Sequence, residues 1–156
     1  QEDWIMIILE PSAGIKKATG IDFKLLSNIL TMLLEVNHKR DLDIIAKIHK
    51  SKISDTSLCE AIDRNNFLIK LDQTAKQTKK FIFSSLLHEL RHCCQYHIWK
   101  YWPDTGKFKT YADYYRSKEE VDARKIERLT REVIKMYDLH VTFNSKFTDL
   151  RLNKLG

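Results

Sequence analysis

The sequence lacks the features of several protein classes. Its cysteines number three, and two of them, Cys93 and Cys94, are adjacent and therefore pair poorly with each other. We therefore expect no secreted disulfide scaffold, and we expect a cytoplasmic or other reducing compartment. No apolar run approaches the roughly 18–20 residues that a membrane span needs, so no membrane partner is expected. The chain also contains no internal repeat and no low-complexity segment.

What is present indicates one globular domain. The chain has 156 residues, of which 43% are hydrophobic and 31% charged, and no segment divides 1–156 into two units. Residues 140–156 form a basic tail of mixed pattern that predicts no particular element. The net charge of +6 is compatible with a nucleic acid or an acidic partner, although the basic residues are scattered. The first residue is Gln rather than Met, which is compatible with a removed targeting segment.

The spacing of the apolar residues predicts an α+β fold. Short Ile-rich runs bounded by turn residues are typical of strands, and leucines three or four residues apart are typical of amphipathic helices. Two short apolar runs around a polar turn predict a hairpin. The expected strands cover 4–9, 42–48, 58–62 and 67–71, and the expected helices cover 21–36, 78–102 and 117–137. This order describes a small sheet with an N-terminal helix, followed by two consecutive helices.

A segment within the second expected helix carries a metal-binding pattern. His88, Glu89 and His92 form H-E-x-x-H. On a helix, positions four residues apart share one face, so both imidazoles can bind one Zn²⁺ at roughly 2.0–2.1 Å. Glu89 is turned about 100° from His88, where it can take a proton from a metal-activated water without binding the metal itself. The spacing therefore predicts a zinc site with Glu89 as the general base.

The expected helix has two different faces. One apolar stripe lies opposite the histidines on a helical wheel and can pack on the core. The stripe consists of Phe83, Leu87, Leu90, Cys94, Ile98 and Tyr101. The other face offers the two histidines and Gln95, so this helix can be buried behind and can bind a metal in front.

These residues resemble a known family. The segments HELRHCCQ at 88–95 and EVDA at 120–123 are similar to those of small zincin-like proteins of bacteria and phages, which carry H-E-x-x-H-x-x-Q and a later E-x-[DE]-A. The resemblance covers roughly 67–137, and it implies a compact zincin-like domain in which the strand 67–71 lines the cleft. The extended metzincin pattern does not fit, because it needs Gly at position 95 and His at position 98, where this chain has Gln95 and Ile98.

The third metal ligand has more than one candidate. The resemblance implies a carboxylate from the helix that starts near Ser117, and Glu120 matches the pattern. The segment from Ser117 to Glu120 is also a capping box, in which Glu120 would fold back onto the backbone of Ser117. Glu119 projects onto the inward stripe of the same helix and is the second candidate. Asp122 is the third, with the alternative role of orienting a ligand histidine.

Residues near the motif have structural explanations as well as functional ones. A tyrosine among Tyr111, Tyr114 and Tyr115 could stabilise an oxyanion, and packing on the helix connection is the alternative. Arg91 is expected to be a surface residue or to form a salt bridge. Cys94 is expected in the core, and Cys93 points too far from His92 to be a ligand.

The resemblance implies a zinc-dependent metallopeptidase. His88, His92 and Glu120 would bind Zn²⁺, Glu89 would act as general base, and the strand 67–71 would hold a peptide or protein substrate by strand addition. A second hypothesis is a catalytically silent protein on the same scaffold, with a structural or protein-binding role, for example in a phage particle. A third is a basic nucleic-acid-binding module, which the charge of +6 suggests.

Overall fold

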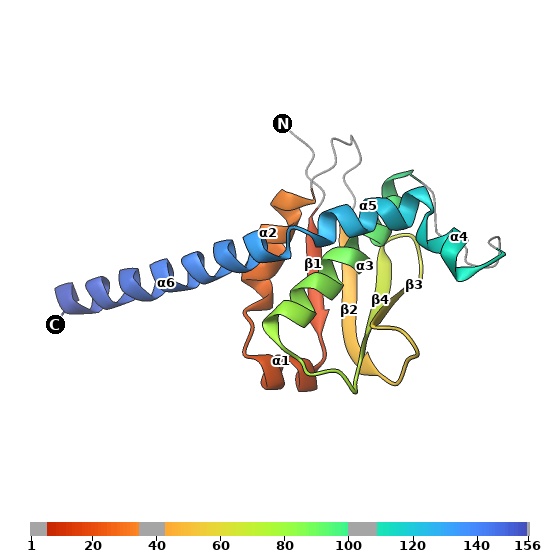
Figure 1. The fold of residues 1–156 in the computed structure, drawn as a ribbon. Coiled ribbons are helices and arrows are strands. Elements are labelled where there is room, and N and C mark those ends of the chain that lie inside the picture. Colours follow the sequence, from red (N-terminus) through yellow and green to blue (C-terminus); the bar gives the residue numbers. More distant parts are fainter. Residues whose placement is uncertain (1–5, 35–42, 100–108, 156) are drawn as a thin grey trace.

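A four-stranded mixed sheet supports the rest of the chain (Figure 1). The computed structural model describes residues 6–34, 43–99 and 109–155. The strand order is β1-β2-β4-β3; β1, β2 and β4 run parallel, and β3 is antiparallel to β4. The strands are β1 (Ile7–Pro11), β2 (Ile44–Ser51), β3 (Ser57–Ala61) and β4 (Asn66–Asp72).

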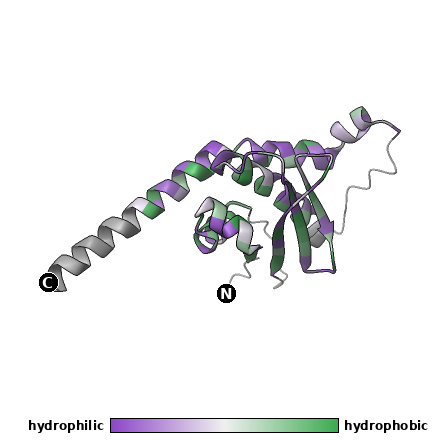
Figure 2. Ribbon diagram, turned by 90° about the horizontal axis from the view of Figure 1, so that it is seen from below, coloured by the Kyte–Doolittle hydropathy of each residue, from purple (hydrophilic) through white to green (hydrophobic). Residues whose placement is uncertain are grey.

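One face of the sheet is apolar because side chains alternate along each strand. In β4, Phe67, Ile69 and Leu71 are fully buried, and Phe67 and Ile69 lie beside Ala46 and Ile48 of β2. The opposite face carries charged and polar side chains together with partly buried apolar ones, and Figure 2 shows hydrophobic and hydrophilic residues mixed along the strands. The buried face therefore fixes the register and carries the helices.

Most of the helices pack with this face around one core. Helix α3 contacts the sheet on one side and α5 and α6 on the other, while α2 packs on β1. Helix α6 then continues past the body of the molecule (Figure 1). Among the described residues, none of the helices has the length and apolar character needed to cross a membrane. The helices are α1 (Ala13–Thr19), α2 (Phe23–Leu33), α3 (Lys79–Trp99), α4 (Tyr111–Tyr115), α5 (Lys118–Glu127) and α6 (Thr130–Leu155).

Capping residues set where the short helices begin and end. Asp22 and Ser117 cap the N-termini of α2 and α5, because each side chain accepts a hydrogen bond from the backbone N–H three residues later. Gly20 ends α1 with a φ of 63°, a left-handed conformation that glycine adopts without steric cost. These capping interactions fix the ends of the short helices and so the start of each connection to the next element.

The predicted α+β class, the hairpin and the helices at α2 and α3 are confirmed, with shifted boundaries. The expected starts at positions 4 and 42 and the expected ends at positions 36 and 102 lie outside the described residues. Helix α1 was not predicted, since its seven residues bury only Ile15. The single helix expected over 117–137 was wrong. The chain forms α5 and α6 there, and α6 extends through the tail for which no element was expected.

The break between α5 and α6 has a local cause. The backbone N–H of Leu129 donates to Ile126 O, a tighter turn than that of an α-helix, and the Thr130 hydroxyl donates to Glu127 O. After this turn, Val133 and Tyr137 of α6 are buried in the core. The hydrophobic spacing continues through the break, which is why the sequence pattern did not reveal it.

Candidate metal centre

Helix α3 is buried on more faces than its apolar stripe predicts. Phe83, Leu87, Leu90 and Cys94 pack in the core as expected, and the side chains of the other two stripe residues lie outside the described part. The face with the histidines is covered by α5, which packs closely along α3. His92 is consequently only 4% exposed. Polar residues of α3 and α5 meet at this interface.

His88, His92 and Glu120 form a compact cluster between α3 and α5. Their ligand atoms all lie within 4.8 Å of one another. The two Nε2 atoms are 3.2 Å apart. Glu120 Oε1 lies 2.9 Å from His88 Nε2, and Glu120 Oε2 lies 3.0 Å from His92 Nε2. In the described part of the chain, this group could hold a metal ion.

The spacing within the cluster fits a shared cation. Ligand atoms bound tetrahedrally at roughly 2.0–2.1 Å from one ion lie about 3.3 Å apart, close to the separations found here. Two imidazole Nε2 atoms that face each other at 3.2 Å can share at most one hydrogen, and both lone pairs are satisfied when a cation lies between them. Two imidazoles and one carboxylate also form an ordinary donor set for a divalent transition metal.

The structure distinguishes among the three acidic candidates on α5. Only the Glu120 carboxylate reaches the two histidines. Glu119 meets the network through its backbone oxygen, which accepts a hydrogen bond from Gln95. Only one of the two hydrogen bonds of the capping box forms. Ser117 Oγ accepts from the Glu120 N–H, but the Ser117 N–H donates to Tyr114 O and not to the Glu120 side chain. The Glu120 side chain is therefore free to point into the cluster.

Charge within the cluster is balanced by protons when no metal is bound. Burial would lower the pKa of His88, but contacts with Glu120 and Glu127 raise it to about 10. Burial would likewise raise the pKa of Glu120, yet hydrogen bonds with both histidines hold it far below its usual value. At neutral pH a protonated His88 therefore faces an ionised Glu120, and the positive charge of His88 lies where a cation would bind.

Gln95 holds His92 in one orientation. Its Oε1 accepts a hydrogen bond from His92 Nδ1 at 2.8 Å, which leaves Nε2 directed at the cluster. Its Nε2 donates to Glu119 O and to Asp122 Oδ2. Asp122 is fixed by the Arg91 guanidinium at 2.6 and 3.2 Å, so the ion pair expected for Arg91 is confirmed. Asp122 thus acts on the ligand histidine through Gln95 and does not contact it directly.

If the cluster binds a divalent metal, replacing Gln95 with Ala is expected to weaken the binding of added Zn²⁺ by about 10–100-fold, because His92 loses the acceptor that fixes its ring. Competition with a chromophoric chelator measures this affinity. Gln77→Ala is the matched control, since Gln77 caps backbone oxygens before α3 and lies outside the cluster. Equal affinities for the Gln95→Ala protein and the wild type would refute the role of Gln95.

Glu89 lies beside the cluster but is not part of it. It is 6% exposed, and its Oε2 accepts a hydrogen bond of 2.7 Å from the hydroxyl of Ser57 in β3. Burial raises the pKa of Glu89, although the neighbouring histidines and Ser57 oppose the rise. Ser57 was missed by the sequence analysis, because it lies 32 residues earlier and is brought there only by the pairing of β3 with β4.

The cluster opens into a cleft of about 380 Å³ that is bounded by β3, α3, α4 and α5. Strand β3 forms the wall opposite the histidines and pairs only with β4 in the described residues. The prediction that the strand 67–71 lies at the cleft edge was wrong: β4 pairs on both sides, with β2 and with β3. The sequence showed the hairpin, but not which of its strands joins β2.

The three tyrosines of α4 have different environments. Tyr114 lines the cleft, and burial and the hydrogen bond with Glu120 raise the pKa of its hydroxyl far above the usual value. Tyr115 packs under the Arg124 guanidinium, 3.5 Å from its ring centroid, and Tyr111 is largely exposed. Of the three, Tyr114 is the one whose hydroxyl is hydrogen-bonded to Glu120 of the cluster.

Two cysteines are in contact between the cleft wall and α3. Cys59 of β3 lines the cleft, and its Sγ lies 3.2 Å from Sγ of the buried Cys93 of α3. Cys94 is buried in the core, as predicted. The Cys59–Cys93 contact spans 34 residues of the chain.

Treatment with oxidised glutathione is expected to join Cys59 to Cys93. Each thiol gives up one hydrogen, and the oxidant is reduced to two glutathione molecules. Peptide mass spectrometry should show the linked pair, and the melting temperature should rise by several degrees because the unfolded chain is constrained. Cys94→Ser should keep this response and Cys59→Ser should lose it. A linkage that involves Cys94 would contradict the assignment.

Comparison with known proteins adds no relative. No protein-family model, no curated protein and no solved structure matches this chain.

Proposed function

We propose that the protein is a zinc-dependent metallopeptidase with a compact zincin-like fold. The observation that carries the proposal is the convergence of His88, His92 and Glu120 beside a buried Glu89 that remains outside the cluster. Two histidines and a carboxylate are also a donor set for Fe²⁺. The adjacent carboxylate favours zinc, because metal-assisted hydrolysis uses a general base next to the ion.

The chain's own residues then have distinct tasks. A bound zinc ion supplies a Lewis acid that polarises a carbonyl and acidifies a water. Glu89 accepts a proton from the attacking water and returns it to the leaving amine. Ser57 holds one oxygen of Glu89 in place through its hydrogen bond. Tyr114 keeps its proton, and its hydroxyl, once turned away from Glu120, could donate a hydrogen bond to the developing oxyanion.

Strand β3 is the part of the cleft that suits a peptide substrate. Its free edge in the described structure offers backbone N–H and C=O groups to an extended chain, which would add as a further strand. Ser57 and Cys59 lie in this strand and line the cleft, so a peptide paired there passes the cluster. The substrate class that this geometry supports is an extended peptide segment.

The test is a digest of a mixed peptide library followed by mass spectrometry. Metal-free protein, protein reloaded with one equivalent of zinc, and zinc-loaded Glu89→Gln protein are compared. We expect cleavage only by the zinc-loaded wild type. Zinc bound at one equivalent with no cleavage of any peptide would overturn the proposal in favour of the catalytically silent scaffold.

A further inference from the structure

The cleft continues past His88 into a groove between α3 and the α5–α6 junction. The groove has a volume of about 600 Å³, and it shares Ser84 and Glu127 with the cleft that holds the metal cluster. Lys80, Ser84 and His88 follow one another at four-residue spacing, so they share one face of α3. A chain that leaves the cluster along this face therefore enters the groove.

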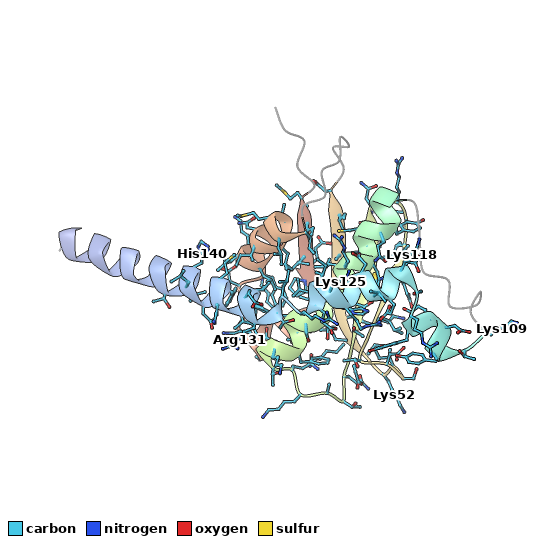
Figure 3. All side chains as sticks on the ribbon, turned by 45° about the horizontal axis from the view of Figure 1, so that its top comes forward. Lys52, Lys109, Lys118, Lys125, Arg131 and His140 are labelled. Carbon is cyan, nitrogen blue, oxygen red and sulfur yellow. The ribbon has the colours of Figure 1, made fainter. Side chains whose placement is uncertain are left out.

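The groove is strongly basic. Four exposed cations line it: two arginines, Arg128 and Arg131, and two lysines, Lys80 and Lys135. None of these four forms an ion pair with a described side chain, whereas Lys70 and Lys79, both outside the groove, do. Figure 3 shows Arg131 at the start of α6, beside the first turns of α3. The lining includes a single acid, Glu127, which lies at the His88 end.

We propose that this groove is a specificity site for acidic side chains of the peptide on one side of the scissile bond. The inference rests on the proposed function. Unpaired lysines and arginines in a concave wall concentrate a positive field, and arginine can bind a carboxylate with two hydrogen bonds. His88 lies eight residues after Lys80, a rise of about 12 Å along the helix, which an extended peptide covers in about four residues. The preference therefore applies to the first four residues on that side.

The lining of the groove favours a peptide over a nucleic acid. Sites that bind single-stranded nucleic acid combine basic residues with aromatic side chains on which bases stack. None of the described residues that line the groove is aromatic. A carboxylate on a flexible side chain needs only the cations.

The experiment compares two charge reversals of equal size. Arg131→Glu with Lys135→Glu changes the groove, and Lys118→Glu with Lys125→Glu changes two exposed cations of α5 that line neither the groove nor the cleft. The substrates are a neutral peptide that the wild type cleaves and variants with Asp at each of the four positions on either side. We expect Asp on one side to raise kcat/KM by about 5–30-fold in the wild type and in the α5 variant, and we expect the groove variant to lose this gain.

A binding measurement separates this inference from the proposed function. Fluorescence anisotropy with zinc-loaded Glu89→Gln protein compares a labelled acidic peptide with its neutral counterpart, and it needs no cleavage. A neutral peptide that is cleaved without any gain from Asp would refute the groove and leave the peptidase intact. Equal losses in both charge reversals, or tighter binding of a single-stranded oligonucleotide than of the acidic peptide, would also refute it.

Discussion

Replacing Glu89 with Gln is expected to reduce kcat by about 10²–10⁴-fold and to leave zinc binding unchanged. Gln has the same shape and can still accept the hydrogen bond from Ser57, so the wall of the cleft should keep its geometry. It has no basic oxygen to take the proton of the attacking water. Metal content is measured by atomic emission and the rate with a peptide that the wild type cleaves.

Two further observations make this result specific. Glu10→Gln changes an exposed acid of β1 and should leave kcat unchanged. Because burial raises the pKa of Glu89, the wild-type rate should fall as the pH is lowered through that pKa, since the base becomes protonated. A Glu89→Gln protein that retains the wild-type rate would mean that another group moves the proton.

Replacing His92 or Glu120 with Ala is expected to reduce bound zinc from about one equivalent to below about a tenth, because two protein ligands are too few for a catalytic zinc site. Removing Glu120 also leaves the largely buried His88 without its carboxylate partner. The zinc-dependent increase in melting temperature should therefore disappear in both variants. Metal analysis after dialysis and thermal denaturation with and without zinc provide the two readouts.

The chain offers a close control for each ligand. Glu119→Ala removes the neighbouring carboxylate of α5, whose backbone oxygen alone joins the network, and His49→Ala removes an exposed histidine of β2. Both proteins should bind zinc as the wild type does. Loss of zinc from Glu119→Ala with retention by Glu120→Ala would reassign the third ligand.

The metal-free site gives the same experiment a pH dependence. The pKa of His88 is raised to about 10, so His88 is protonated at pH 7 and must lose this proton when zinc binds. Calorimetry in buffers of different ionisation enthalpy should therefore detect about one proton released at pH 7. Zinc affinity should fall about tenfold for each pH unit below neutrality, until other ligands also become protonated.

The part of the site that lies on one helix could be predicted from the sequence. If the segment is a helix, the spacing of His88, Glu89 and His92 fixes the relative directions of their side chains. The apolar stripe on the opposite face supports the assignment of a helix. The third candidate ligand could not be chosen from the sequence, because Glu119, Glu120 and Asp122 all lie within one turn of the next helix. The capping box also offered the Glu120 side chain a different partner, the backbone of Ser117. In the structure the Ser117 N–H donates to Tyr114 O, so it does not bind the Glu120 side chain, which points into the cluster instead.

The site residues that could not be predicted from the sequence are those brought there by contacts between distant segments. Ser57 and Cys59 reach the site because β3 pairs at the edge of the sheet, and the hydrophobic pattern of a hairpin does not say which strand will lie inside. Glu127 lies 3.4 Å from His88 Nδ1 only because α5 packs along α3. Local spacing therefore identified the two candidate histidines and the resemblance pointed to Glu120, but neither revealed the residues that form the walls around them.

The long α6 has a practical consequence for studying the protein. From Thr130 to Leu155 the helix rises about 38 Å at 1.5 Å per residue, and it leaves the body on the side away from α4 (Figure 1). A dye, an affinity handle or a surface anchor joined behind Leu155 is thus carried well clear of the candidate metal cluster, and an immobilised molecule leaves the cleft beside that cluster facing the medium.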